Sequence, residues 1–326
     1  MRRTSFLISL TLAAAALVVP EPALAAGQLL VLNKSADTLA FVDPDKLEVL
    51  ATVATGHAPH EVAVDATGST AYISNYGTQT DPGHTLSVVD VAGRRAVTVI
   101  DLGEFTRPHG IVIAQDGSLW VTCEGSQAVV VVDPKERKVV RSFSTGEQVT
   151  HMIVLAPGGG KAFTANIGSD TVTMIDASTG EVTRIPVGKG PEGIDITPDG
   201  RQVWVAHRAD GGLSIIDAGT GKVTRTIEKI GEMPIRLKFT ADGGRALISC
   251  ANGGEVVIYD AREVKELGRI KTGEMPVGIL VMPGGHRAFV ANTRSDRVTL
   301  LDLDKREILG TFSPGKEPDG LAWSSR

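Results

Sequence analysis

Short stretches of alternating apolar and polar residues fill most of the chain, and Pro, Asp and Gly residues interrupt them at regular intervals. Residues 193–227 show the pattern clearly, with alternating or apolar stretches at 193–197, 203–206, 213–217 and 223–227 and a Pro-Asp-Gly turn at 198–200. A period of two between turn residues is typical of antiparallel strands and not of helices. The pattern therefore predicts an antiparallel meander of four short strands.

This meander recurs along the chain. An Asp follows an apolar strand in seven copies, at Asp43, Asp90, Asp133, Asp176, Asp217, Asp260 and Asp302. Intervals of 41 to 47 residues are typical of propellers and solenoids. Ten residues before six of these Asp residues stand Asn33, Cys123, Asn166, His207, Cys250 and Asn292, whereas the copy that contains Asn75 has five extra residues within 77–84.

The two ends of the chain complete one another. The first copy begins at its second strand, residues 29–33, and the sequence finishes with an isolated first strand at 320–323. A four-stranded meander cannot bury both faces alone, so the copies must stack radially, and pairing of the terminal strands closes the ring. We predict an all-β fold, a seven-bladed β-propeller of four-stranded antiparallel blades in one domain, residues 26–326, closed by the N- and C-terminal strands in one blade.

The first 25 residues have the three parts of a secretory signal peptide. Met1-Arg2-Arg3 precedes an apolar run at 6–19, and small residues around Ala25 form a cleavage site. The apolar run is too short for a membrane-spanning helix, which needs about 20 residues. We expect cleavage near Ala25 and a periplasmic or secreted protein; the Arg pair leaves open whether export follows the general or the twin-arginine route.

Charge limits the partners that we expect. The formal net charge is −5, and no cluster of Lys and Arg interrupts the sequence. A mildly acidic protein without a basic patch repels phosphate backbones, so we expect no nucleic-acid partner. Nothing after residue 25 is long and apolar enough to span a bilayer. A periplasmic protein or a small-molecule ligand is the expected partner.

Three second-strand segments carry a family resemblance. Ala71-Tyr72-Ile73-Ser74-Asn75 and the corresponding residues 162–166 and 288–292 are similar to the repeats of the YVTN family of β-propeller proteins, over nearly the whole chain after residue 25. The resemblance implies the seven-bladed fold and little about activity. The sequence is YncE-like, and it is similar to a subset associated with PQQ-dependent catabolism. The repeat also resembles the propellers of nitrous-oxide reductase and of haem d1 nitrite reductase, which hold their cofactors with His at one mouth.

One repeat position concentrates the candidate chemistry. The connections into the innermost strands align, and their shared position is occupied by His60, His109, His151, Glu192, Ile235, Val277 and Asp319. These side chains should surround the mouth of the central channel. We predict a ligand site formed by His57, His60, His109, His151, Glu192 and Asp319. His84 and His207 should lie on the same face, and His286 on the opposite face.

Three convergent imidazoles with a carboxylate suit zinc or copper, so His60, His109 and His151 are candidate metal ligands. Metal affinity should then fall below about pH 6, where free imidazoles become protonated. Two other interpretations remain open: the histidines form a hydrogen-bonded rim without a ligand, or they transfer protons. Cys123 is a further candidate, a soft ligand beside His109 that would favour copper.

Other recurrent residues have structural roles. Each repeat Asp begins a turn, where its carboxylate accepts backbone N–H bonds. Cys123 and Cys250 share one repeat position but lie three blades apart, so we expect two buried free thiols and no intrachain disulfide.

Three functional classes fit these observations. The leading hypothesis is an extracytoplasmic binding or scaffold protein with a His-rich ligand or metal site at the channel mouth. The first alternative is a redox enzyme or cofactor carrier like the reductases named above, although the chain has no C-x-x-C-H haem motif. The second is a hydrolase or lyase with His109 or His151 as base, although no G-x-S-x-G nucleophile motif is present. The absence of nucleophile, haem and quinone-docking motifs favours a protein that is not an enzyme.

Overall fold

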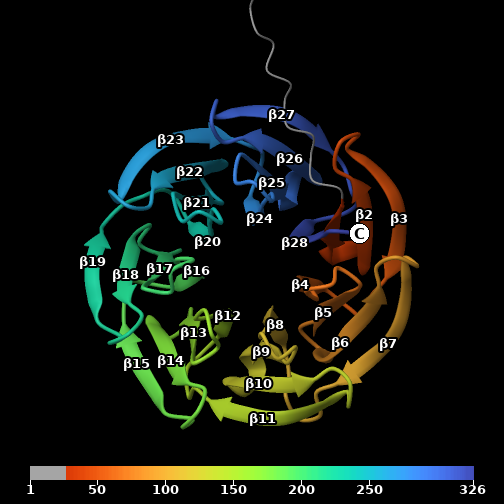
Figure 1. The fold of residues 1–326 in the computed structure, drawn as a ribbon, viewed down its shortest axis with the longest axis horizontal. Coiled ribbons are helices and arrows are strands. Elements are labelled where there is room, and N and C mark those ends of the chain that lie inside the picture. Colours follow the sequence, from red (N-terminus) through yellow and green to blue (C-terminus); the bar gives the residue numbers. More distant parts are fainter. Residues whose placement is uncertain (1–26) are drawn as a thin grey trace, which may run out of the picture.

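The computed structural model describes residues 27–326, so the predicted signal peptide at residues 1–25 lies outside the described residues. Seven four-stranded antiparallel sheets surround a central axis and form the predicted β-propeller (Figure 1). Among residues 27–326 the only helical segments are three single turns, η1 (Lys34–Ala36), η2 (Glu124–Ser126) and η3 (Thr293–Ser295). None of the helices in the described part of the chain is long and apolar enough to cross a membrane.

Each blade runs outward from the axis in the order predicted by the meander. The innermost strands are β28 (Pro318–Ser324), β4 (Pro59–Val64), β8 (Pro108–Ile113), β12 (Thr150–Leu155), β16 (Pro191–Ile196), β20 (Pro234–Phe239) and β24 (Pro276–Val281). The second strands are β1 (Gln28–Asn33), β5 (Thr70–Gly77), β9 (Leu119–Cys123), β13 (Lys161–Asn166), β17 (Gln202–His207), β21 (Arg245–Cys250) and β25 (Arg287–Asn292).

The two remaining strands complete each blade. The third strands are β2 (Thr38–Asp43), β6 (Pro82–Asp90), β10 (Ala128–Asp133), β14 (Thr171–Asp176), β18 (Leu213–Asp217), β22 (Glu255–Asp260) and β26 (Arg297–Asp302). The outermost strands are β3 (Glu48–Ala54), β7 (Arg95–Asp101), β11 (Lys138–Ser144), β15 (Val182–Pro186), β19 (Val223–Ile227), β23 (Lys265–Lys271) and β27 (Glu307–Phe312).

The terminal strands share a sheet, as the sequence predicts. The strand order of the closing blade is β28-β1-β2-β3, and β1 pairs antiparallel with β28, with Leu29 opposite Trp323 and Leu30 opposite Ala322. A side-chain hydrogen bond also joins the two terminal segments: the Gln28 Nε2 donates to the Arg326 carbonyl at 2.8 Å. The chain therefore leaves no inner strand unpaired at the junction.

The hydrophobic core lies between neighbouring blades. Trp204 of β17 is fully buried, and its ring packs edge-on against Phe239 of β20 in the next blade, with ring centroids 5.3 Å apart. The repeat Asp residues have the structural role that was predicted; the carboxylate of Asp43, for example, accepts the backbone N–H groups of Asp45 and Lys46 at 3.0 Å. Cys123 and Cys250 are both buried and free.

One backbone feature recurs in every blade and decides which side chains reach the mouth. The residue before each innermost strand has a positive φ, between 48° and 63°, at Ala58, Arg107, Val149, Gly190, Met233, Met275 and Glu317. Glycine adopts this conformation without steric cost, and Gly190 is the only glycine of the seven. Six blades therefore keep a side chain at a position that glycine would occupy more easily.

Val149→Gly is expected to raise the free energy of unfolding by about 1 kcal/mol. Val149 is β-branched, has φ 55° and leaves 36% of its surface exposed, so strain is relieved and little packing is lost. Urea unfolding of both proteins measures the difference. Gly190→Val provides the reverse exchange at the same repeat position and should be destabilising; a less stable Val149→Gly protein would contradict the strain argument.

Candidate functional site

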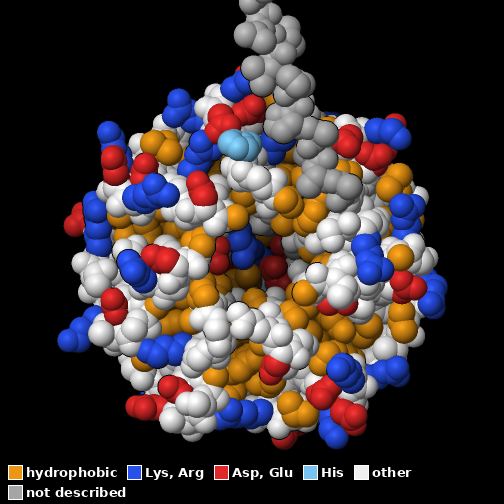
Figure 2. Space-filling view, in the orientation of Figure 1, with side chains coloured by type: hydrophobic (Ala, Val, Ile, Leu, Met, Phe, Trp, Pro, Cys, Tyr) orange, Lys and Arg blue, Asp and Glu red, His pale blue; other side chains and the backbone are white. Residues whose placement is uncertain are grey.

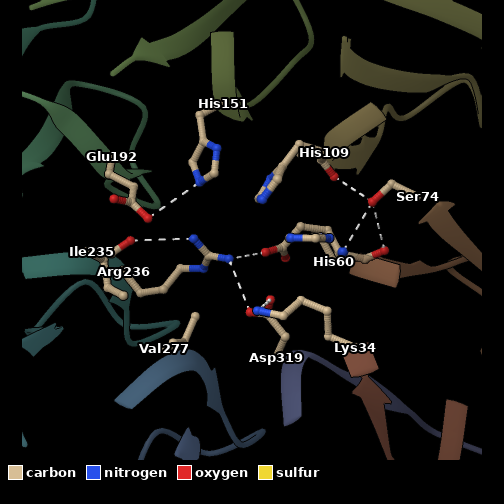
Figure 3. A network of polar contacts seen from close by, with 12 residues as sticks. Lys34, His60, Ser74, His109, His151, Glu192, Ile235, Arg236, Val277 and Asp319 are labelled. Atoms are coloured by element: carbon tan, nitrogen blue, oxygen red, sulfur yellow. Dashed lines mark hydrogen bonds and ion pairs between the residues drawn. The ribbon is translucent and has the colours of Figure 1, made fainter. Parts of the chain in front are cut away.

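The mouth of the channel is built from three positions of the repeat. The first is the predicted ring at the second residue of each innermost strand, which Figure 3 shows converging on the axis at His60, His109, His151, Glu192, Ile235, Val277 and Asp319. The second is the ring of positive-φ residues. The third directly follows the second strand in six blades and is the penultimate residue of β5 at Tyr76; its members are Lys34, Tyr76, Glu124, Ile167, Arg208, Ala251 and Thr293.

Backbone hydrogen bonds hold the second and third rings together. In all seven blades the N–H of the third-ring residue donates to the carbonyl of the positive-φ residue, over 2.8 to 3.2 Å. Tyr76 donates in this way to Ala58, and Glu124 to Arg107. This pairing brings side chains from the end of the second strand to the same mouth as the predicted histidines.

The three rings enclose a pocket of about 310 Å³. One wall is polar and contains His60, Tyr76, His109, Glu124 and His151, and another is aliphatic; the complete lining is Lys34, His60, Tyr76, His109, Glu124, Val149, His151, Ile167, Glu192, Arg208, Met233, Ile235, Arg236, Met275, Val277, Thr293 and Asp319. Figure 2 shows the molecule as a disc with a hollow at its centre, in which acidic and basic side chains are visible.

Five of the six predicted site residues line this pocket, and His57 does not. His60, His109, His151, Glu192 and Asp319 are part of the lining. The side chain of His57 is 71% exposed, and its Nδ1 lies 2.8 Å from the Asp37 carboxylate. His57 precedes the innermost strand by two residues, and in that loop its ring points away from the channel to Asp37.

The remaining predicted candidates also lie outside the lining. Cys123 is fully buried at the end of β9, and burial raises the pKa of its thiol to about 12, so the structure does not support it as a metal ligand beside His109. His84 is exposed, and the buried His207 has its Nδ1 3.3 Å from Asp210. His286 pairs with Asp304 at 2.7 Å.

The imidazoles form a row along the polar wall (Figure 3). Ring centroids are 4.8 Å apart for His60 and His109 and 3.7 Å apart for His109 and His151. The Tyr76 ring lies 4.6 Å from His60. Ligand atoms of His109, Glu124 and His151 all lie within 4.8 Å of one another, which is close enough for one metal ion.

Two carboxylates surround His151. Its Nδ1 is hydrogen-bonded to Glu124, and its Nε2 lies 3.5 Å from Glu192. Burial alone lowers the pKa of His151, but the hydrogen bonds to Glu124 and Glu192 outweigh burial and raise it to about 9. Tyr76 donates its hydroxyl to the other Glu124 oxygen at 2.6 Å, so the Glu124 carboxylate is fixed between Tyr76 and His151.

The other two imidazoles are neutral. Burial lowers the pKa of His60, and burial together with the positive charges of its neighbours holds the pKa of His109 well below its usual range. The His60 Nδ1 donates to the Ala58 carbonyl at 2.8 Å, whereas the Nδ1 of His109 is buried and has no hydrogen-bond partner within residues 27–326. Neutral imidazoles can bind a metal without first losing a proton.

A network of ion pairs crosses the channel beside the histidines. Arg236 is hydrogen-bonded to Glu61, and its Nη2 lies 3.7 Å from Asp319, which in turn lies 3.9 Å from Lys34 (Figure 3). Burial raises the pKa of Glu61, although the charge of Arg236 opposes this rise. The network joins blades that are far apart in the sequence.

Sequence reasoning missed Tyr76, Glu124, Glu61 and Arg236. Two signals could have found them. Tyr76 and Glu124 follow the recurrent residues Asn75 and Cys123, so the next position of the same alignment points to them. Glu61 and Arg236 occupy the position that is glycine in four blades, at Gly110, Gly193, Gly278 and Gly320, and their opposite charges indicate a pair.

The metal-free protein should be most stable near pH 6.5. The pKa of His151 is raised, so its contribution is fully present below pH 6.5 and is lost as the pH rises to about 9, a fall of about 3 kcal/mol. The pKa of His109 is lowered, so stability falls as the pH drops below 6.5 and the unfolded state binds the proton first. Urea unfolding between pH 5 and 9 measures both slopes.

Matched variants separate these two contributions. His151→Gln should remove the alkaline slope, and His109→Asn should reduce the acid slope, to which the buried His60 also contributes. The exposed His286→Ala should leave both unchanged. A wild-type protein whose stability rises from pH 6.5 to 9 would contradict the assignment of a charged His151.

Known proteins match this chain at the level of repeat and fold. The model of the cytochrome D1 heme domain matches residues 145–293, and that of the NHL repeat matches residues 105–132. No curated protein matches the sequence. The match to the cytochrome D1 heme domain includes His151, Glu192 and Arg236 but covers less than half of the chain.

Solved structures share the architecture over nearly the whole chain. Hydrazine synthase of Kuenenia stuttgartiensis is 22% identical, with a TM-score of 0.75 over 89% of this chain and 99% of that chain. The periplasmic gluconolactonase of Pseudomonas aeruginosa is 18% identical, with a TM-score of 0.75 over 91% and 99%. Dihydro-heme d1 dehydrogenase NirN is 14% identical, with a TM-score of 0.65 over 93% and 76%. Identities this low establish the fold alone, and the matches together support a β-propeller repeat protein.

Proposed function

We propose that this propeller is an extracytoplasmic binding protein that holds a transition-metal ion in the mouth pocket. The observation that carries the proposal is the group of His109, Glu124 and His151, whose ligand atoms lie within 4.8 Å of one another. Two imidazoles and one carboxylate suit zinc and also copper, and they leave a fourth position open. Export is supported by the signal-peptide pattern at residues 1–25.

The surroundings of these ligands support metal binding. Nδ1 of His109 is buried without a partner, so an ion would satisfy it. Tyr76 holds Glu124 in place, and a hydrogen bond from a neighbour is a usual feature of metal-bound carboxylates. His60 donates from Nδ1 to a backbone carbonyl, which leaves its Nε2 as the nitrogen of an alternative ligand in place of His151.

Calorimetric titration of the metal-stripped protein with Zn²⁺ and Cu²⁺ tests the proposal. One ion should bind per chain to the wild type, and His109→Ala should lose that site. Equal binding by the two proteins would exclude the pocket, and no binding by either would leave the hydrogen-bonded rim as the better interpretation.

The structure gives less support to the other functional classes. About 310 Å³ is at the lower end of small-molecule pockets, which run from about 300 to 1,000 Å³, so a haem d1-type cofactor would have to open the mouth. The lowered pKa of His109 would suit the general base of a hydrolase, and the raised pKa of His151 would suit its general acid. However, Thr293 is the only Ser, Thr or Cys in the described lining, and its hydroxyl donates to the Pro318 carbonyl.

A further inference from the structure

The mouth pocket has two chemically distinct walls. At the ring position that holds His or an acid in five blades, two neighbouring blades carry Ile235 and Val277, which are 2% and 8% exposed. Met233 and Met275 pack against them and line the same pocket. Figure 3 shows Ile235 and Val277 across the channel from His109. A bare ion would use only the polar wall.

The volume of the pocket also exceeds the needs of an ion. A water molecule occupies about 30 Å³ in the liquid, so an ion with two or three waters fills on the order of 100 Å³. The pocket measures about 310 Å³. The remaining space adjoins aliphatic side chains, where water makes few hydrogen bonds and is readily displaced by an apolar group.

The two methionines are kept at a conformational cost. Met233 has φ 56° and Met275 has φ 57°, whereas the same repeat position is Gly190 in another blade. This backbone conformation is shared by six blades, so what distinguishes these two is the side chain. The flexible thioether of methionine adapts to ligands of different shape, which suits an aliphatic wall that contacts an apolar body.

Charge selects the head group of the molecule that would fill this space. Arg236 and Asp319 at the channel wall already have charged partners within the network. A divalent ion with one carboxylate ligand, Glu124, retains one positive charge and an open coordination position. A single oxyanion balances this remaining charge and occupies the open coordination position.

We infer that the metal-loaded pocket takes a small monoanion with an oxygen head group on the metal and an apolar body against Met233, Ile235, Met275 and Val277. This inference rests on the proposed metal site. It names the ligand class that the site would select, which is an amphipathic organic acid of modest size.

Alkyl hydroxamates of increasing length test the inference, because their head group binds zinc through oxygen and only their apolar body varies. Calorimetry would compare acetohydroxamate, butyrohydroxamate and hexanohydroxamate on the zinc-loaded protein. Affinity should rise about fourfold for each added methylene. The double variant Met233→Gly/Met275→Gly should lose most of this dependence on length while binding zinc as the wild type does.

Ala58→Gly is the matched control, because Ala58 has the same positive φ but lies outside the lining. It should keep the full dependence on length, and glycine suits this backbone in all three positions, so the variants should fold. If zinc binds but the affinity for hydroxamates does not change with the length of the alkyl chain, the inference is overturned and the proposed metal site stands. Equal binding of hexanohydroxamate to metal-free protein would overturn the metal-bound head group. Absence of zinc binding would overturn the proposed function and the inference together.

Discussion

Deletion of residues 318–326 is expected to abolish the cooperative unfolding transition. These residues include β28, the innermost strand of the closing blade, which pairs with β1 and contacts β4 and β24 on either side. Leu321 and Trp323 pack against the core of one neighbouring blade interface, and Ala322 belongs to the core of the other. Loss of this packing and of the hydrogen bonds between β28 and β1 should lower the free energy of unfolding by on the order of 5–10 kcal/mol. This is comparable with the whole free energy of unfolding of a typical domain, about 5–15 kcal/mol.

The open ring should also aggregate, because β1 would expose its unpaired N–H and C=O groups. Circular dichroism during heating and size-exclusion chromatography measure the two effects. The control deletion of residues 325 and 326 leaves β28 intact and should melt close to the full chain. A protein without residues 318–326 that melts cooperatively at the same temperature would show that closure by the terminal strands is not needed for stability.

The fold was predictable because its determinants repeat. An Asp at intervals of 41 to 47 residues fixes the register of seven copies, and each Asp accepts backbone N–H bonds at the start of a turn. The incomplete first and last copies then require a shared blade. Local chemistry and global closure therefore give the same answer, which is the condition under which sequence reasoning succeeds.

The site was only partly predictable. The repeat register gives the position of a residue around the channel axis, but it does not give the direction of its side chain or the partner that the side chain contacts. His60, His109 and His151 share one position, so their convergence follows from symmetry. His57 is three residues before His60, and its pairing with Asp37 depends on the local loop. Arg236 and Glu61 are 175 residues apart in the sequence and pair across the channel. This pairing depends on the length of the side chains and on the width of the channel.

The protonation states also required the structure. From the sequence, three equivalent imidazoles predict loss of metal affinity below about pH 6. The structure makes them unequal: burial lowers the pKa of His60 and His109, whereas Glu124 and Glu192 raise that of His151 to about 9. The proton on His151 is therefore the main competitor of a metal ion at neutral pH.

The variants His109→Ala and Glu124→Gln, which each remove a proposed ligand, are expected to weaken zinc binding at pH 7.5 by at least about 100-fold. The expectation follows because even the loss of a neighbour that orients a ligand costs 10–100-fold. Glu124→Gln keeps the size of the side chain but replaces one of its two acceptor oxygens by an NH2 donor, so a loss in this variant reports on the missing charge and acceptor together. His57→Ala and His286→Ala are matched controls, since both imidazoles pair with an exposed carboxylate outside the pocket. These controls should bind zinc as the wild type does.

The pH dependence then identifies His151 as a ligand. If zinc binds its nitrogen, one proton must leave, so affinity should rise about tenfold per pH unit between pH 7 and 9 and level off above the pKa of about 9. Titrations at one pH in buffers of different ionisation enthalpy count the released protons directly and should give close to one per zinc at pH 7.5. Since His60 and His109 are already neutral at this pH, they contribute no proton. Zinc binding that depends on His109 and Glu124 but releases no proton would place the ion on His60, His109 and Glu124, with His151 left as a charged neighbour. Binding that survives both substitutions would remove the metal from the mouth altogether.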